Sequence, residues 1–256
     1  MSAQAKNRII NVCLSAGAIV CMWAVWLIAC AVVNDGYVIP SFPDTAERFF
    51  ALLGSGGFWL SFAKSLGRTA LSWAVSLLAA AALAFACAAF PRVRAFAAPF
   101  VAVFRTVPTM AITLMLLIWT SPRVAPVIVG FLMLFPITYS QMMAAVDGMD
   151  AGLAQMADVY GISAGERLFK IYIPQILPPV LSQVGANFSL TLKVIISAEV
   201  MCSTFDSLGG MIHQSNVFLD TAQMFALTIC ALLAGGLLQW ALSKLALITR
   251  RRGGSA

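Results

Sequence analysis

Three ionisable residues lie inside long apolar stretches of this chain and are its strongest candidates for chemistry: Arg105, Lys193 and Glu199. A charge at the centre of a bilayer costs roughly 2.5–3.5 kcal/mol on insertion scales, so each of them needs an opposite charge or water. Lys193 and Glu199 are six residues apart, and at about 100° per residue they do not share a helix face. Two interpretations stay open. Either Arg105 and Glu199 form a structural ion pair between two helices, or Arg105 or Lys193 lines a water-filled cavity at a dimer interface and attracts an anionic substrate.

The segment that carries Lys193 is also rich in small and polar residues. They are Ser182, Gln183, Gly185, Asn187, Ser189 and Thr191. Residues of this kind either line a cavity or let two helices approach closely. The sequence predicts a path through the membrane whose candidate lining residues are Arg105, Gln183, Asn187, Lys193 and Glu199.

The chain offers little for covalent or metal chemistry. It has one histidine and six cysteines, with no C-x-x-C or H-x-x-x-H spacing, so we expect neither a metal site nor a disulfide framework. Glu199 alone does not make a catalytic set, and the phosphate-binding pattern G-x-x-x-x-G-K-[ST] does not occur. We therefore expect no enzyme activity and no cofactor in this chain.

The elements that position these residues are membrane spans. The chain has 256 residues, of which 61% are hydrophobic and 10% charged, a balance typical of integral membrane proteins. A helix needs about 20 apolar residues to cross a hydrocarbon core about 30 Å thick. Six segments qualify, namely 9–33, 69–90, 95–120, 124–146, 175–202 and 222–243. The expected fold is an all-α integral membrane protein with six transmembrane helices in a single domain over residues 1–256.

The distribution of basic residues predicts the orientation. If both termini are cytoplasmic, the inside segments hold Lys6, Arg8, Arg92, Arg94, Arg167, Lys170, Lys244, Arg250, Arg251 and Arg252. The outside segments then hold Arg48, Lys64, Arg68 and Arg123. Ten against four favours both termini inside, as an even number of spans requires.

Prolines predict where helices are interrupted. Pro108, Pro136, Pro178 and Pro179 should kink or break the spans that contain them. Residues 39–44 read as a turn-rich outer loop because they contain two prolines. Residues 57–68 form either an interfacial helix or the beginning of the second span, and His213 is expected in a solvated outer loop.

The longest inside segment, residues 147–174, contains an amphipathic pattern. Leu153, Met156, Ala157 and Tyr160 follow the spacing i, i+3, i+4, i+7, which predicts a short helix with one apolar face. Gly161 then fits a left-handed helix end. The pattern from Ser163 to Glu166 is a capping box that starts a second helix running to Ile173, before Pro174. On periodicity alone the segment is either a surface connector or a docking helix.

This loop resembles one found in the permease subunits of bacterial ATP-binding-cassette importers. That family pattern is E-A-A, three residues, Gly, nine residues, Ile-x-Leu-Pro. Here Gly161 is followed after nine residues by Ile171, Tyr172, Ile173 and Pro174, whereas Gln155 and Met156 replace the Glu and first Ala before Ala157.

Other stretches resemble the branch that imports nitrate, sulfonates and taurine. They are Ile39-Pro40-Ser41-Phe42-Pro43, Arg105-Thr106-Val107-Pro108, Ala198-Glu199 and Ser207-Leu208-Gly209-Gly210-Met211-Ile212. The resemblance covers about residues 38–252 and implies a permease of the type I importer kind in the bacterial cytoplasmic (inner) membrane.

The resemblance also implies how the chain works and with what. The loop helix would dock into a separate ATPase subunit through Leu153, Met156, Ala157 and Tyr160, with Gln155 and Asp158 at the polar rim. ATP and Mg would be bound by two such ATP-binding subunits. The remaining implied partners are a second permease copy in a homodimer, an external solute-binding protein and the lipid bilayer, with no nucleic acid.

We expect this subunit to form, by alternating access, the translocation path for a small polar and anionic solute resembling nitrate, sulfonate or taurine. An importer of a vitamin precursor or another neutral heterocycle is the alternative within the same class. A secondary transporter would require paired repeats with broken helices, and a membrane-embedded enzyme would require clustered catalytic side chains. Neither feature is evident in the sequence.

Overall fold

The computed structural model describes residues 3–33, 35–149, 152, 156, 159–163, 166 and 168–253, and their regular structure is helical throughout. The helices are α1 (Ala3–Val33), α2 (Phe42–Leu53), α3 (Gly56–Ala89), α4 (Pro91–Thr106), α5 (Thr109–Trp119), α6 (Ala125–Asp147), the π-helix η1 (Leu168–Tyr172), α9 (Ile173–Met201), α10 (Leu208–Val217) and α11 (Thr221–Gly253). The all-α expectation is thus confirmed.

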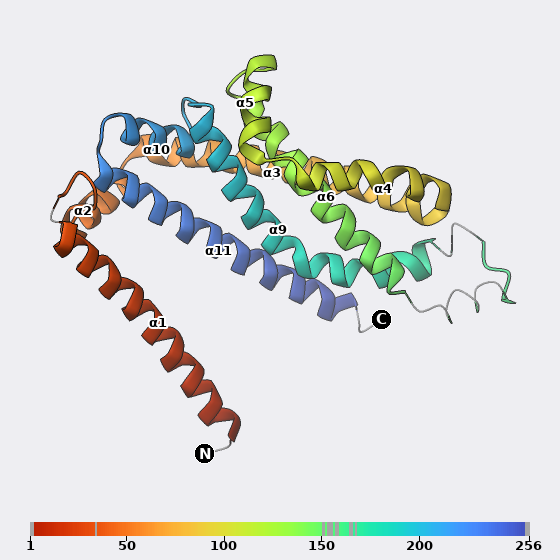
Figure 1. The fold of residues 1–256 in the computed structure, drawn as a ribbon. Helices are drawn as coiled ribbons and strands as arrows, with labels where there is room; N and C mark the ends of the chain where they lie inside the picture. Colours follow the sequence, from red (N-terminus) through yellow and green to blue (C-terminus); the bar gives the residue numbers. More distant parts are fainter. Residues whose placement is uncertain are drawn as a thin grey trace.

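Helix α9 is the centre of the bundle. It packs against α3, α6, α10 and α11 (Figure 1). Small residues allow this close packing, since a Cβ on Gly185 would collide with Ser243 and the Gln239 carbonyl of α11. A Cβ on Gly130 of α6 would likewise meet Ser72 of α3 and Ile195 of α9. Because apolar side chains gain little from leaving lipid, such backbone proximity holds membrane helices together.

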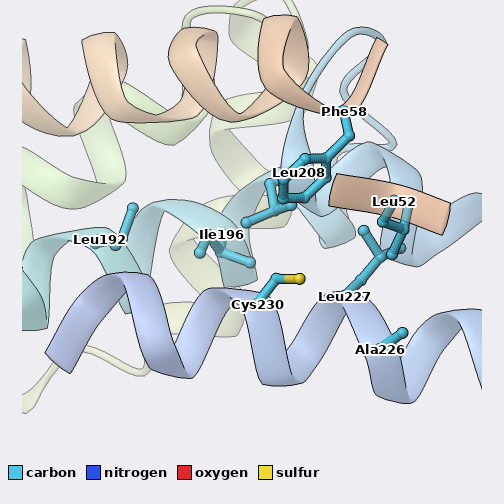
Figure 2. Close-up of a cluster of buried hydrophobic side chains, with 8 residues drawn as sticks. All are labelled: Leu52, Phe58, Leu192, Ile196, Leu208, Ala226, Leu227 and Cys230. Atoms are coloured by element: carbon cyan, nitrogen blue, oxygen red, sulfur yellow. The ribbon is translucent and has the colours of Figure 1, made fainter. Parts of the chain in front are cut away.

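The two ends of the bundle have separate apolar cores. The cluster at the α10 end draws side chains from α2, α3, α9, α10 and α11 (Figure 2). It consists of Leu52, Phe58, Leu192, Ile196, Leu208, Ala226, Leu227 and Cys230. At the opposite end, where α6 ends and α9 begins, a second cluster joins α3, α4 and α6 around Ala84, Val101 and Tyr139.

Helix α3 packs through a buried stripe of hydroxyl side chains. Ser65, Thr69, Ser72 and Ser76 are all fully buried, and the Thr69 and Ser76 hydroxyls donate to the carbonyls of Ser65 and Ser72, four residues earlier. This local bonding lets small polar groups be buried without distant partners. The helix begins at Gly56, so residues 57–68 extend the second span rather than forming a separate interfacial helix.

The predicted span 95–120 is broken at Pro108, which confirms the interruption predicted at this proline. Helices α4 and α5 meet at a bend of 96°, with Val107 and Pro108 between them in extended conformation. Proline lacks the N–H that would continue the helix and disfavours helical geometry in the residue before it. Pro136, Pro178 and Pro179, in contrast, lie inside the continuous helices α6 and α9.

Most predicted spans correspond to long apolar helices. Within the described residues, α3, α6, α9 and α11 are long and apolar enough to cross a membrane, and the bent pair α4–α5 supplies a fifth if it counts as one span. The described apolar part of α1 is Val20–Val33. Helix α1 leans away from the bundle (Figure 1) and touches it through Trp26, whose ring stacks on Phe225 and meets Phe42 edge-on.

Two short helices replace predicted loops. Residues 39–44 are not simply a turn, because Ser41 caps α2: its Oγ accepts from the Asp44 N–H at 3.3 Å and donates to the Asp44 carboxylate at 2.6 Å. Proline is well tolerated in a first helical turn, so Pro43 starts the helix instead of preventing it. His213 lies within α10, where its Nε2 is 2.9 Å from the Ser203 hydroxyl.

Candidate functional site

A cavity lies between the start of α5 and the C-terminal half of α9. Its volume is about 700 Å³, and Lys193 is its charged lining residue. Thr109, Thr113 and Ser197 add hydroxyl groups to the lining. The bend at Pro108 creates this space because it directs α5 away from the line of α4 (Figure 1).

Lys193 has no anionic partner among the described residues. Its side chain is exposed, and no ion pair or hydrogen bond joins its ammonium to any described residue. The Ser197 hydroxyl, one turn further along α9, is likewise exposed and unbonded within the described part of the chain. Among the described residues, the cavity therefore presents one unpaired cation, Lys193, and one unbonded hydroxyl, Ser197.

These two residues belong to the exposed stripe of helix α9 between Gln183 and Met201. Its members are Gln183, Ala186, Leu190, Lys193 and Ser197. Alternating steps of three and four residues keep them on one helical face. The neighbours Leu192, Ile195, Ile196 and Ala198 are buried. We call this set the α9 stripe.

The α9 stripe differs in polarity from the outer faces of the bundle. On α11 the exposed large side chains include Leu232, Leu237 and Trp240, which suits contact with lipid tails. A face bearing Gln183, Lys193 and Ser197 would be costly in lipid. The stripe therefore requires water or another protein surface.

Asn187 is placed beside the stripe rather than on it. It is 8% exposed and forms a reciprocal amide pair with Gln141 of α6, with N···O distances of 2.7 and 3.2 Å. Gln183 is on the exposed face. The sequence did not single out Gln141, because an amide within an apolar helix carries no spacing signal for a partner on a different helix.

The predicted ion pair between Arg105 and Glu199 does not form. Arg105 is exposed at the end of α4 and its guanidinium donates to the Ser140 hydroxyl of α6, which in turn donates to the Pro136 carbonyl. Arg105 is thereby held to α6 through a hydroxyl that bonds the α6 backbone.

Glu199 pairs with Arg68 of α3 instead. The carboxylate is 0% exposed, and its Oε1 lies 2.7 Å from the Arg68 Nη1. The Ser65 hydroxyl donates to Oε2 at 2.7 Å, and the Gly209 N–H of α10 donates to the same oxygen at 3.2 Å. Ser65 also accepts from the Leu208 N–H. Glu199 thus ties α3, α9 and α10 together and does not reach the Lys193 cavity.

The loop between α9 and α10 is strained and carries a second ion pair. Ser203 and Asp206 have positive φ angles of 49° and 53°, which non-glycine residues adopt at some energetic cost. Asp206 lies 3.0 Å from Lys64, and this hydrogen-bonded cation lowers the pKa of the Asp206 carboxyl below its ordinary value. Ser203 and Asp206 line a hollow of about 530 Å³ that is also lined by His213.

The predicted docking segment is described only in part. Leu153, Gln155, Ala157 and Asp158 lie outside the described residues. Met156 and Tyr160 are exposed, by 47% and 74%, so both are free to meet a partner. Gly161 has φ +62°, which confirms the left-handed turn predicted there.

The capping box after this turn is confirmed. The Ser163 hydroxyl accepts from the Glu166 N–H and donates to the Glu166 carboxylate. Lys170 lies 2.8 Å from Glu166 and lowers the pKa of its carboxyl. Ile171 and Ile173 are half-buried, and Pro174 is exposed beside Gly148 in a hollow between α6 and α9.

The end of α6 that leads into this segment is anchored. Both guanidinium nitrogens of Arg94 at the start of α4 lie 2.7 Å from the Asp147 carboxylate oxygens. Such two-point contacts fix orientation as well as distance.

A broken span, a polar stripe on a central helix and exposed residues in the segment between α6 and η1 fit the membrane subunit of a transport protein. The chain belongs to the family described as the inner membrane component of binding-protein-dependent transport systems, which it matches over residues 76–249. It is therefore an inner-membrane permease, and membership of the family implies association with ATP-binding and solute-binding proteins.

Two relatives within this family are permeases named for taurine and aliphatic sulfonates. The chain is 23% identical to the taurine transport system permease protein TauC of Escherichia coli (strain K12), over 88% of this chain and 84% of the relative. It is 24% identical to a protein of Bacillus subtilis (strain 168) named as an aliphatic sulfonates transport permease, SsuC, over 76% of this chain and 70% of the relative.

A solved structure supports the fold. A chain from the crystal structure of an amino acid ABC transporter with histidines aligns with a TM-score of 0.61. The alignment covers 81% of this chain and 94% of that one, at 18% identity.

Proposed function

We propose that this protein forms the translocation path of an ATP-driven importer for small anionic solutes of the sulfonate class. The observation that carries the proposal is the α9 stripe, in which the unpaired Lys193 opens into a cavity inside the membrane-spanning bundle. An ammonium at this depth needs a counter-charge, and a sulfonate is an anion that can supply it. The taurine and aliphatic sulfonate relatives point to the same solute class.

The chemistry of the cavity favours an anion over the alternative cargo. A vitamin precursor or other neutral heterocycle would leave the Lys193 charge without compensation. Arg105 does not line this cavity and donates to Ser140, and Glu199 is buried in its pair with Arg68. Of the candidate path residues, Lys193 and Gln183 are those on the α9 stripe.

The proposed assembly has two permease copies, two ATP-binding subunits and an external binding protein. Each copy would cross the membrane six times with both termini in the cytoplasm. ATP and Mg would be held by the ATP-binding subunits, so this chain would do no covalent chemistry. Closure of those subunits would act on the segment around Tyr160 and bias the bundle between inward-open and outward-open states.

Co-purification with an ATP-binding subunit tests this function. Tyr160→Asp should abolish the complex, because a carboxylate would have to be buried in an apolar docking cleft. Tyr37→Asp is a matched control, since Tyr37 is equally exposed, at 74%, but lies in the α1–α2 connection. It should leave the complex intact.

Proteoliposomes supply the decisive outcome. Uptake of an alkanesulfonate should require ATP, the ATP-binding subunits and the binding protein together. Accumulation along an ion gradient by the permease alone would instead identify a secondary transporter and overturn the proposal.

A further inference from the structure

The Lys193 cavity is open on the side of the α9 stripe. Helix α9 is enclosed by α3, α6, α10 and α11, and α5 covers part of its remaining face. The stripe residues stay exposed along the full run from Gln183 to Ser197. A face that carries Gln183, Lys193 and Ser197 is costly in lipid, and a second protein surface across a water-filled space would shield it from lipid.

A second copy of the chain supplies such a surface. This step rests on the proposed function, in which two permeases form one path. Two identical α9 stripes facing each other would place two unpaired lysines on opposite walls of one space. Like charges held in a low-dielectric region repel, and an anion between them removes the repulsion and pairs both.

We propose that Lys193 residues from two copies together bind a single anionic headgroup, so that the pair of permeases carries one solute-binding site rather than two. Ser197, one turn away on the same face, has a free hydroxyl to donate to the headgroup oxygens. A sulfonate offers three acceptor oxygens, enough for two ammonium groups and a hydroxyl. Each subunit alone holds half of the site.

A tandem fusion of two copies allows the lysines to be removed one at a time. The probe is methanesulfonate, added at constant ionic strength to the purified assembly with its ATP-binding subunits, and the readout is the thermal unfolding midpoint. Wild type should show a saturable rise, since a ligand that binds the folded state stabilises it. Lys193→Met in one copy should raise the apparent Kd by about tenfold or more, as expected for loss of one charged contact. The same change in both copies should abolish the saturable rise.

Lys244→Met in one or both copies is the control, because Lys244 is an exposed lysine on α11, away from the cavity lining. It should leave the response unchanged. If the single Lys193→Met fusion kept the wild-type Kd with half the number of sites, the two copies would carry independent sites. That result would overturn the proposal of one site shared between them. A wild-type assembly that still couples ATP to uptake but shows no saturable response would overturn this site while leaving the proposed function standing.

Cross-linking provides a separate test of proximity. In a Cys21→Ser background, which removes an exposed native thiol, Ser197→Cys should be joined between copies by a flexible bis-maleimide that spans the water-filled space. Leu232→Cys on the lipid-facing side of α11 should not. Failure of Ser197→Cys to cross-link in an intact dimer would contradict the proposal that the α9 stripes of two copies face each other.

Discussion

At the scale of single residues, burial distinguishes two charged residues of the same helix, Glu199 and Lys193. Glu199 is fully buried and satisfied by Arg68, Ser65 and the Gly209 N–H, whereas Lys193 is exposed to a cavity without a partner. A buried carboxylate that accepts several hydrogen bonds is stabilised in its ionised form and holds the helices around it together. The exposed ammonium of Lys193 lines a cavity, and under the proposed function it is the anion-binding group.

Glu199→Gln should strongly destabilise the protein, because it leaves the Arg68 guanidinium without its counter-charge. Loss of one member of a buried pair costs about 3–5 kcal/mol, which thermal unfolding in detergent would detect. The double variant with Arg68→Met should recover part of this loss, since both charges are then absent. Equal stability of Glu199→Gln and wild type would show that the Arg68–Glu199 pair does not stabilise the fold.

At the scale of helices, packing depends on where glycine permits close approach. Gly185 of α9 sits against α11, where an added Cβ would meet Ser243 and the Gln239 carbonyl. Gly236 of α11 has no atom within 4 Å of the position a Cβ would occupy. The two glycines are equivalent in sequence context, both lying within apolar helices, and only the tertiary contact distinguishes them.

Gly185→Ala should therefore force α9 and α11 apart, at a cost of about 1–3 kcal/mol typical of overpacking. Gly236→Ala should be neutral or slightly stabilising, because alanine favours the helix. Melting temperatures of the two variants measure the difference. A Gly185→Ala protein as stable as Gly236→Ala would mean that the helices can separate without loss.

At the scale of the whole molecule, the helix ends fall into two groups. Arg94 at the start of α4 meets Asp147 at the end of α6, near the loop that contains Tyr160. Leu52, Phe58, Leu208 and Leu227 gather at the other end. The bundle thus has one end that leads into the segment proposed to meet the ATP-binding subunits, and another with α2 and α10 lying across it (Figure 1).

This polarity predicts the labelling of intact cells by a membrane-impermeant maleimide. In the Cys21→Ser background, Phe218→Cys beside α10 should react from outside, and Ser163→Cys should react only after the cells are opened. Both side chains are exposed in the structure, so access to the reagent depends on the side of the membrane. Reaction of Ser163→Cys in intact cells would reverse the proposed orientation.

Local chemistry explains which features could be predicted. Gly161 and the Ser163–Glu166 capping box follow from residue type and spacing within a few positions, and both are confirmed. Helix α10 and the partner of Glu199 could not be predicted in this way. Arg68 and Glu199 are 131 residues apart in the chain, and no local pattern records which helix will lie beside another.

The sequence by itself determined that this is a helical membrane protein with charges in its spans, because hydrophobicity and helical periodicity act over short distances along the chain. The tertiary structure decided which charge is available. It buried Glu199 against Arg68, turned Arg105 to Ser140, and bent the chain at Pro108 so that Lys193 faces an open cavity. Those outcomes depend on contacts between distant helices, and the packing of small residues such as Gly130 and Gly185 sets them.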